Sequence, residues 1–368
     1  MKVFLSPPHQ TGKELEYLKK VLETNYIAPV GEFIEIFENK VKEFVNVKSA
    51  CAVVNRTSAI HLALRLLDIK EGDEVFASTF TFIGSVAPIL YQKAIPFFID
   101  SDFNSWNMSP ELLYDELIQR KKKGKKFPKA IILTHIYGQP AEMDKIMEIA
   151  NEFEIPLIED SAESLGATFN SKHTGTFGIF GIYSFNGNKI ITTGGGGMLV
   201  SDNAELIEKA RYLATQAKEN LPYYEHKTYG YNYRMSNVLA AIGVAQMEVI
   251  EERIKRKREI FQYYKRNLES EEIVFMPELK NAKGNRWLTA VYFKKVNPEK
   301  IRKALEKNKI EARRFWKPMH LQPVFKSAGK KINGVSEFLF SKGLCLPSGT
   351  QLKEEEIDLI IEIIKKNV

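Results

Sequence analysis

The sequence predicts an α/β fold with a mostly parallel central sheet. Short, almost entirely apolar runs read as strands at 74–77, 96–100, 130–134 and 156–160. Segments with apolar residues at helical spacing separate these runs, near 81–92, 110–121 and 142–153. Apolar strands separated by helices are typical of a parallel sheet that is covered on both faces. Ligands of such sheets lie beyond the carboxyl ends of the strands, which places Asp160 beside a ligand; the alternative for Asp160 is a helix cap.

Two helices, 13–24 and 31–45, precede this series, with a loop between them. A short strand at 50–54 then runs into an amphipathic helix that opens with Asn55-Arg56-Thr57-Ser58. Backbone N–H groups and hydroxyls at the start of a helix bind anions, and the same residue types also serve as plain helix caps. The sequence leaves both interpretations open.

The second half of the chain predicts a change of domain. A strand at 198–201 and a helix at 203–217 are followed by a polar, tyrosine-rich stretch at 219–236. Residues 237–268 read as one long helix, bent near Gly243, and we expect the boundary inside it. Residues 1–245 then form a large domain and 246–368 a small α/β domain. Its expected elements are the strands 273–276 and 287–293 and the helices 298–307 and 353–366.

The composition predicts a cytoplasmic protein that contacts neither a membrane nor nucleic acid. The chain has 368 residues, 44% of them hydrophobic, with no apolar run of membrane-spanning length and no signal-peptide segment in its first residues. The net charge of +7 comes largely from basic runs at 120–126 and 253–258. Aromatic residues do not interrupt these runs, so we expect solvated faces, and an anionic substrate is compatible with the charge. Cys51 and Cys345 have no companion ligands at metal-binding spacing, which predicts no metal site.

The most informative stretch runs from Gly181 to Lys189 and is followed by four glycines, Gly194 to Gly197. A lysine held away from water loses its proton more easily and becomes an amine nucleophile. The alternative is a surface lysine on a flexible glycine loop. The spacing differs from that of a nucleotide-binding P-loop, because no Gly-Lys-Ser/Thr follows a first glycine at the required distance.

Together these elements resemble the DegT/DnrJ/EryC1/StrS family of sugar aminotransferases nearly end to end. The motifs are Glu159-Asp160-Ser161-Ala162-Glu163, then Ser184-Phe185-Asn186-Gly187-Asn188-Lys189, then Asn232-Tyr233-Arg234. The resemblance implies the pyridoxal-phosphate fold type I, like that of aspartate aminotransferase, with pyridoxal 5′-phosphate as the cofactor. It also implies a homodimer with shared active sites, because Asn232 resembles a phosphate ligand that comes from the neighbouring subunit.

The resemblance also implies roles for individual residues. Lys189 corresponds to the lysine that binds the cofactor covalently, and Asp160 to the carboxylate that keeps its pyridine nitrogen protonated. Glu163 falls near the ring hydroxyl, and Phe82 matches the aromatic residue stacked on the ring. Further matches are to phosphate ligands, at Thr57, Ser58 and Ser184, and to a segment that lines the sugar-nucleotide entrance, from Trp316 to His320; the alternative for His320 is a structural role. Arg234 and Asn285-Arg286-Trp287 are candidates for contacts with nucleotide phosphates, because planar guanidinium groups suit bidentate binding; the alternative for Arg234 is to shape the Asn232 loop. His135 is a weaker candidate, with a structural hydrogen-bonding role as the alternative.

Two departures from the family pattern bear on the substrate. Arg56 stands where the family usually has glycine or alanine, so it either adds a charge near the phosphate or points away. Gly195 replaces a usual glutamate. This glycine resembles the branch that aminates the 4-keto-6-deoxy sugar of UDP-N-acetylglucosamine in bacillosamine-type pathways, with glutamate as the expected amino donor. GDP-perosamine synthases are the alternative. A nucleotide-cofactor oxidoreductase is disfavoured, because no Gly-x-Gly-x-x-Gly follows the first strand.

Overall fold

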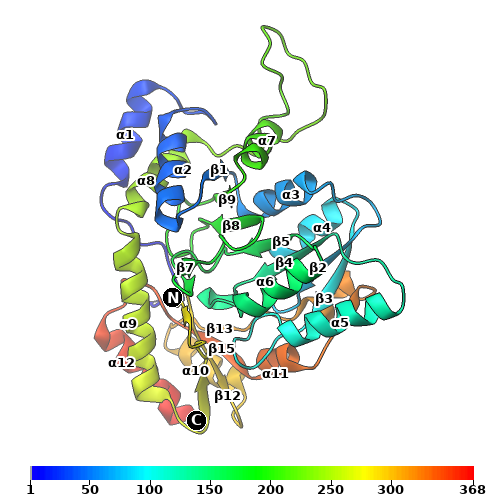
Figure 1. Ribbon diagram of the computed structural model, residues 1–368. Helices are drawn as coiled ribbons and strands as arrows, with labels where there is room; N and C mark the ends of the chain where they lie inside the picture. The colour runs from blue at the N-terminus through cyan, green and yellow to red at the C-terminus, as the bar shows by residue number, and fades with distance from the viewer. Residues whose placement is uncertain (1) are drawn as a thin grey trace.

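The computed structural model describes residues 2–368, and an eight-stranded sheet forms its centre (Figure 1). In spatial order its strands are β1 (Ser49–Val53), β9 (Gly197–Ser201), β8 (Phe180–Ser184), β5 (Leu157–Asp160), β4 (Ala130–Thr134), β2 (Glu74–Ser78), β3 (Ile95–Ile99) and β14 (Gly329–Lys331). All neighbours from β8 to β14 are parallel, whereas β9 pairs antiparallel with both β8 and β1. The predicted α/β fold with a mostly parallel sheet is therefore confirmed.

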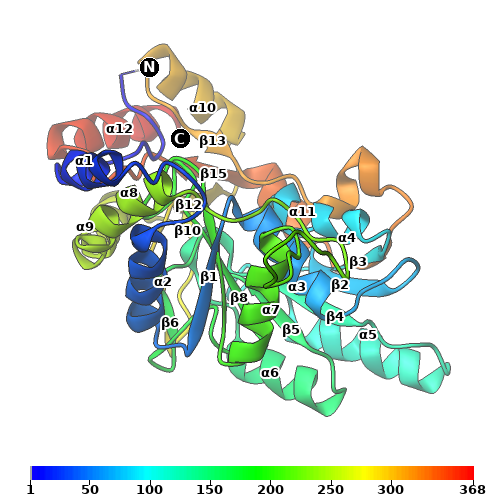
Figure 2. The same cartoon turned by 90° about the horizontal axis from the view of Figure 1, so that it is seen from above.

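Helices cover both faces of this sheet (Figure 2). On one face, residues of α3, α4 and α7 share a buried apolar cluster with inward-facing residues of β1, β5 and β8. The opposite face is covered by α5 and α6 over the parallel strands, and by α2 and α8 next to β1. These helices are α2 (Glu32–Val45), α3 (Arg56–Leu66), α4 (Ala87–Tyr91), α5 (Pro110–Lys122), α6 (Met143–Glu152), α7 (Ala204–Ala214) and α8 (Asn237–Met247). Helix α1 (Glu14–Thr24) packs on α8.

A second, antiparallel sheet lies in the C-terminal part of the chain. Its strands, in spatial order, are β10 (Ile273–Phe275), β12 (Thr289–Phe293), β15 (Gly343–Leu346) and β13 (Arg313–Arg314). The helices around it are α9 (Ile250–Leu268), α10 (Pro298–Lys307), α11 (Val335–Lys342) and α12 (Glu354–Asn367). A small third sheet is made of β6 (Thr168–Phe169), β7 (Lys172–His173) and β11 (Ala282–Lys283). Because β14 joins the large sheet from this part of the chain, the division at residue 245 stays a prediction.

Two local expectations differ from the structure. The long helix breaks at Glu248 and Val249, between α8 and α9, and not at Gly243. Gly243 lies inside α8, where a Cβ would come 2.6 Å from the ring of Phe37, so this glycine allows close helix packing. The helix expected at 81–92 is a 3₁₀ turn followed by the short α4, which has a proline in its first turn.

Within residues 2–368, every helix is too short or too polar to cross a membrane.

Candidate active site

A pocket of about 370 Å³ opens beside the carboxyl ends of β5 and β8 and the start of α3. Segments from the eight-stranded sheet and from the four-stranded sheet line it. The lining residues are Asn55, Arg56, Thr57, Phe82, Glu163, Ser184, Asn186, Asn188, Lys189, Gly195, Gly196, Trp287, Arg313 and Trp316. The structure thus brings together the lysine loop, the helix that opens with Arg56-Thr57, and the acidic motif after β5.

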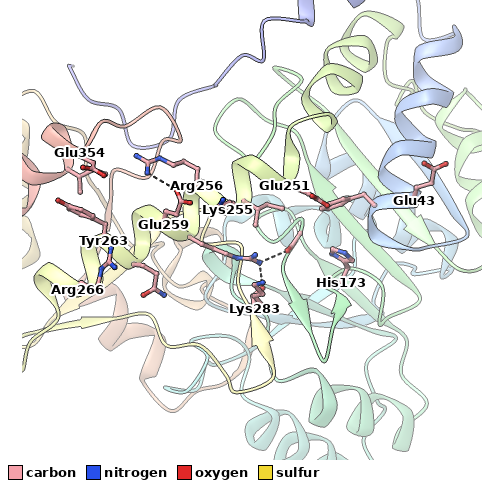
Figure 3. A pocket seen from close by; sticks show the side chains of 16 residues that line it. Glu43, His173, Glu251, Lys255, Arg256, Glu259, Tyr263, Arg266, Lys283 and Glu354 are labelled. Atoms are coloured by element: carbon pink, nitrogen blue, oxygen red, sulfur yellow. Dashed lines mark hydrogen bonds and ion pairs between the residues drawn. The ribbon is translucent and has the colours of Figure 1, made fainter.

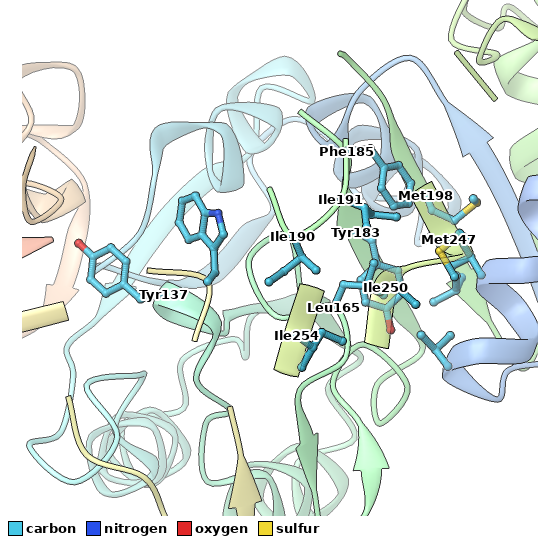
Figure 4. Packing of buried hydrophobic residues seen from close by; sticks show 14 of the residues in the cluster. Tyr137, Leu165, Tyr183, Phe185, Ile190, Ile191, Met198, Met247, Ile250 and Ile254 are labelled. Atoms are coloured by element: carbon cyan, nitrogen blue, oxygen red, sulfur yellow. The ribbon is translucent and has the colours of Figure 1, made fainter. Parts of the chain in front are cut away.

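Lys189 lies on a loop that is anchored in the core on both sides. Phe185 is fully buried before it, and Ile190 and Ile191 are buried after it (Figure 4). The lysine side chain is only 11% exposed, with Nζ 3.5 Å from Glu163 Oε1 and 3.7 Å from the centre of the Trp287 ring. Burial lowers the pKa of Lys189 to about 8, although the negative charge of Glu163 opposes this shift. The amine is therefore easily deprotonated near neutral pH, as a nucleophile requires.

Asp160 ends β5 and is almost completely buried. Its Oδ1 accepts a hydrogen bond from the backbone N–H of Ala162, at 3.3 Å. Its Oδ2 lies 3.3 Å from Nη1 of Arg56, but this contact is not aligned as a hydrogen bond. Oδ2 therefore has no hydrogen-bond partner among residues 2–368. A buried carboxylate oxygen in this state is suited to accept a hydrogen bond from a cationic N–H group of a ligand.

Glu163 is the second buried carboxylate of the site. Its Oε2 accepts a hydrogen bond from the backbone N–H of Tyr137, at 2.7 Å, while Oε1 faces Lys189. Burial raises the pKa of Glu163, and the positive charges of Lys189 and Arg56 oppose this shift. Two carboxylates and two cations therefore share one buried site, in which protons can be exchanged.

The start of α3 contributes both a helix cap and pocket-lining groups. The side chain of Asn55 accepts a hydrogen bond from the N–H of Ser58, at 2.8 Å, so the cap is Asn55 and the hydroxyls of Thr57 and Ser58 are not used for it. Thr57 and Ser184 both line the pocket. Ser58 is buried and is not among the lining residues. The anion-binding interpretation of this helix start is thus compatible with its capping.

The structure places two of the predicted substrate residues inside the fold, which revises the expectation for them. The guanidinium of Arg234 is bound by Glu38 and donates to the carbonyl of Ala52, at 3.0 Å. The ring of His320 bonds to Thr79 and Glu337, at 2.7 and 3.0 Å. Because these polar groups are engaged within the chain, they are not free to bind a substrate.

The weaker candidates have structural partners as well. His135 is buried and bonds to Glu159, at 3.0 Å. The guanidinium of Arg286 stacks on the ring of Phe261, and the side-chain amide of Asn285 donates to the carbonyls of Glu163 and Leu165. The contacts of these residues are therefore structural.

Trp316, Trp287 and Arg313 form part of the pocket wall. Trp316 was predicted, and its ring lies 5.3 Å from that of Phe82. Trp287 had been considered for nucleotide phosphates, but its ring contacts the amine of Lys189 instead. Arg313 on β13 was missed, because nothing in the sequence near it marks a ligand and only the folding of the C-terminal sheet brings it here.

A larger hollow, about 1120 Å³, lies along α9 (Figure 3). Its wall carries both signs of charge, among them Glu251, Glu259, Arg256 and Arg266, and Figure 3 shows these side chains around it. Lys189 and Glu163 line the smaller pocket, so size does not identify the site. Among residues 2–368 no group of three or more His, Cys, Asp or Glu side chains could hold a metal ion.

Comparison with known proteins agrees with this geometry. Residues 8–365 match the sequence model of the DegT/DnrJ/EryC1/StrS aminotransferase family. The chain belongs to this family. One relative of this aminotransferase is EpsN of Bacillus subtilis (strain 168), provisionally named a pyridoxal phosphate-dependent aminotransferase, which is 48% identical over 99% of this chain and 95% of its own length.

Two further comparisons extend the family assignment. The GDP-perosamine synthase of Escherichia coli O157:H7 is 38% identical to this aminotransferase, over 98% of this chain and 96% of that protein. The crystal structure of a DegT DnrJ EryC1 StrS aminotransferase from Brucella abortus superposes with a TM-score of 0.90, at 27% identity, covering 96% of this chain and 95% of that chain. The chain therefore has the fold type I of pyridoxal-phosphate enzymes, as predicted.

The cofactor of this aminotransferase is pyridoxal 5′-phosphate, and the residues present fit it. Oδ2 of Asp160, which accepts no hydrogen bond from residues 2–368, suits a protonated ring nitrogen, and Lys189 offers a buried amine in the pocket. The face of Phe82 and the hydroxyls of Thr57 and Ser184 suit an aromatic ring and a phosphate. When bound, the cofactor supplies an electron sink for a substrate carbanion.

Proposed function

We propose that this aminotransferase transfers an amino group from glutamate to C4 of a nucleotide-linked 4-keto-6-deoxy sugar, UDP-2-acetamido-2,6-dideoxy-4-hexulose. The observation that carries the choice of sugar is Gly195. It lines the pocket, and a Cβ built on it meets nothing within 4 Å. The glutamate usual in the family would extend into this space, so the glycine leaves room for an additional substituent such as the 2-acetamido group.

In this proposal the chain's own residues perform three tasks. Asp160 would hold a proton on the cofactor's ring nitrogen, because Oδ2 of this buried carboxylate accepts no hydrogen bond from residues 2–368. Thr57, Ser58, Ser184 and the start of α3 bind the phosphate. Phe82 stacks on the ring and fixes its plane.

Lys189 has two roles in the proposal. It would bind the cofactor covalently, and as a free amine it would hold and move a proton next to the substrate. A proton carrier needs a pKa near the working pH, and burial brings the pKa of Lys189 to about 8. Glu163 and the ring of Trp287 keep the amine pointed into the pocket.

The mouth of the pocket suits a nucleotide-linked substrate. Trp316 offers an aromatic face, and Arg313, which is half-exposed and paired with Glu311 at 2.7 Å, offers a guanidinium to anionic groups. Glutamate is the proposed amino donor, and its carboxylates and a sugar diphosphate have the same charge sign. Both substrates can therefore use this arginine in turn.

We further propose a homodimer in which Asn232 serves the neighbouring site. The stretch between α7 and α8 protrudes from the body of the protein (Figure 1), and Asn232 within it is exposed. Mixing Asn232→Ala with Lys189→Ala under subunit exchange tests this. If sites are shared, each mixed dimer has one site with both lesions and one with neither, so activity reappears. Activity that stays at the level of the separate variants would refute sharing.

A second candidate function is that of a GDP-perosamine synthase, favoured by the 38% identity to the Escherichia coli enzyme. The deciding experiment compares kcat/KM for UDP-, GDP- and dTDP-linked 4-keto-6-deoxy sugars. We expect the UDP-linked acetamido sugar to be preferred by at least about tenfold, or ~1.4 kcal/mol. Gly195→Glu is the matched variant, and it should lower activity on the acetamido sugar more than on the GDP-linked sugar. A wild-type preference for the GDP-linked sugar would overturn the proposal.

A further inference from the structure

The side chain of Arg56 reaches the carboxylate and the aromatic ring that are assigned above to the cofactor. Its Nη1 lies 3.3 Å from Asp160 Oδ2, and its guanidinium carbon lies 5.6 Å from the centre of the Phe82 ring. The residue is only 6% exposed. A guanidinium is a planar cation that stacks on aromatic faces and pairs with carboxylates. A protonated pyridine ring has the same two properties.

The surrounding chain leaves space for the guanidinium in this position. A Cβ on Gly84 would overlap Nη2 of Arg56 and come within 3.3 Å of the Phe82 ring. The backbone of Gly84 does not adopt a positive φ, so space rather than backbone geometry explains a glycine here. Arg56 therefore does not point away, one of the two orientations that the sequence had left open, and its guanidinium lies beside Asp160 and Phe82.

We propose that Arg56 competes with the pyridinium of pyridoxal 5′-phosphate for Asp160 and Phe82. One carboxylate oxygen and one ring face cannot hold two planar cations at once, so the guanidinium leaves before the cofactor ring takes its place. Arg56 then stabilises the cofactor-free protein and weakens cofactor affinity, relative to the glycine or alanine usual in the family. This inference rests on the family's cofactor and is independent of the sugar.

The test is the dissociation constant of pyridoxal 5′-phosphate, titrated into cofactor-stripped protein and followed by absorbance. Arg56→Ala should lower this constant at least about threefold. Arg65→Ala is the matched control, because it removes the same charge from the other end of α3, and it should leave the constant within about twofold. In an Asp160→Asn background, where the contested carboxylate is gone, Arg56→Ala should also change it less than about twofold.

Gly84→Ala provides a second variant that keeps the arginine but takes its space. It should also lower the dissociation constant. Far-UV circular dichroism shows whether each variant is folded. The cofactor-free Arg56→Ala protein should also melt at a lower temperature than cofactor-free wild type. A dissociation constant that rises, stays unchanged or falls by less than threefold in Arg56→Ala would overturn the proposal, as would an equal fall in the Asp160→Asn background.

Discussion

Two buried lysines lie close to the same loop, and they differ in what holds them. Lys189 is on the loop itself, with its amine in the pocket beside Glu163 and against the ring of Trp287. Lys257 is on α9, only 2% exposed, and its amine donates to Ser6 Oγ and to the carbonyl of Trp287, at 2.8 and 2.9 Å. Burial lowers the pKa of both, to about 8 for Lys189 and about 7 for Lys257.

A low pKa therefore does not by itself distinguish a reactive lysine from a structural one. Lys257 joins the N-terminal segment to the C-terminal part of the chain, and Ser6 and the indole N–H of Trp287 in turn donate to the carbonyl of Asn188. Its amine is thus used to fix the loop that carries Lys189. Lys189 has no such backbone contacts among residues 2–368, and its pocket is also lined by Arg56, which contacts the buried carboxylate of Asp160. The surroundings, rather than burial, identify the reactive amine.

The largest effect should come from removing the reactive lysine. Lys189→Ala should lower transamination at least about a thousandfold, because the same amine binds the cofactor and moves the proton. Turnover is measured with a nucleotide-linked keto sugar and glutamate, and the unfolding midpoint should stay near that of wild type. Turnover like wild type, without added amines, would contradict the assignment.

A smaller loss of activity is expected from substitution of Asp160, the buried carboxylate near Lys189. Asp160→Asn should keep the cofactor bound but slow single turnovers by more than about tenfold, or ~1.4 kcal/mol, because a neutral amide does not stabilise a protonated ring nitrogen. Rapid-mixing absorbance measures this rate. Rates within tenfold of wild type would mean that Asp160 has a different role.

The smallest effect on turnover is expected for the structural lysine. Lys257→Met should leave kcat within about tenfold of wild type. This substitution should instead change how the stability of the protein depends on pH. Between pH 7 and the ordinary lysine pKa of 10.5, the unfolded chain holds a proton that folded Lys257 has released. Stability therefore rises with pH in this window, by up to about 1.4 kcal/mol per pH unit for this group.

Urea unfolding at pH 7 and pH 9 measures that contribution. The free energy of unfolding should increase less between these pH values in Lys257→Met than in wild type, and Lys255→Met on the same helix is the matched control. Equal pH slopes in Lys257→Met and wild type would show that Lys257 is not buried as an uncharged amine.

Helices and strands were predicted from the sequence where the local spacing of apolar residues determines them. The helices near residues 14–24 and 110–122, and the parallel strands up to Asp160, follow from apolar spacing. Strand β8 was not predicted, although it lies in the middle of the sheet. Gly181 in this strand weakens a strand pattern, yet the backbone of Gly175 packs so closely against it that a side chain would not fit.

Within the site, Lys189, Asp160 and Glu163 were predicted, and the structure brings them together. The direction of Arg56 was not predictable, because it depends on Gly84, which belongs to a different segment. Arg234 and His320 were expected at the substrate, but Glu38 and Glu337 bind them, and these partners are distant in sequence. Which polar groups are already engaged is a property of the folded chain, so sequence patterns do not reveal it.

We assign cofactor binding to Lys189 and not to its buried neighbour Lys257. Borohydride reduction of the holoenzyme makes the bond between lysine and cofactor permanent, and digestion followed by mass spectrometry locates it. We predict the added mass on the peptide that contains Lys189, and its loss in Lys189→Ala but not in Lys257→Met. Added mass on the peptide that contains Lys257, or on neither peptide, would contradict the account.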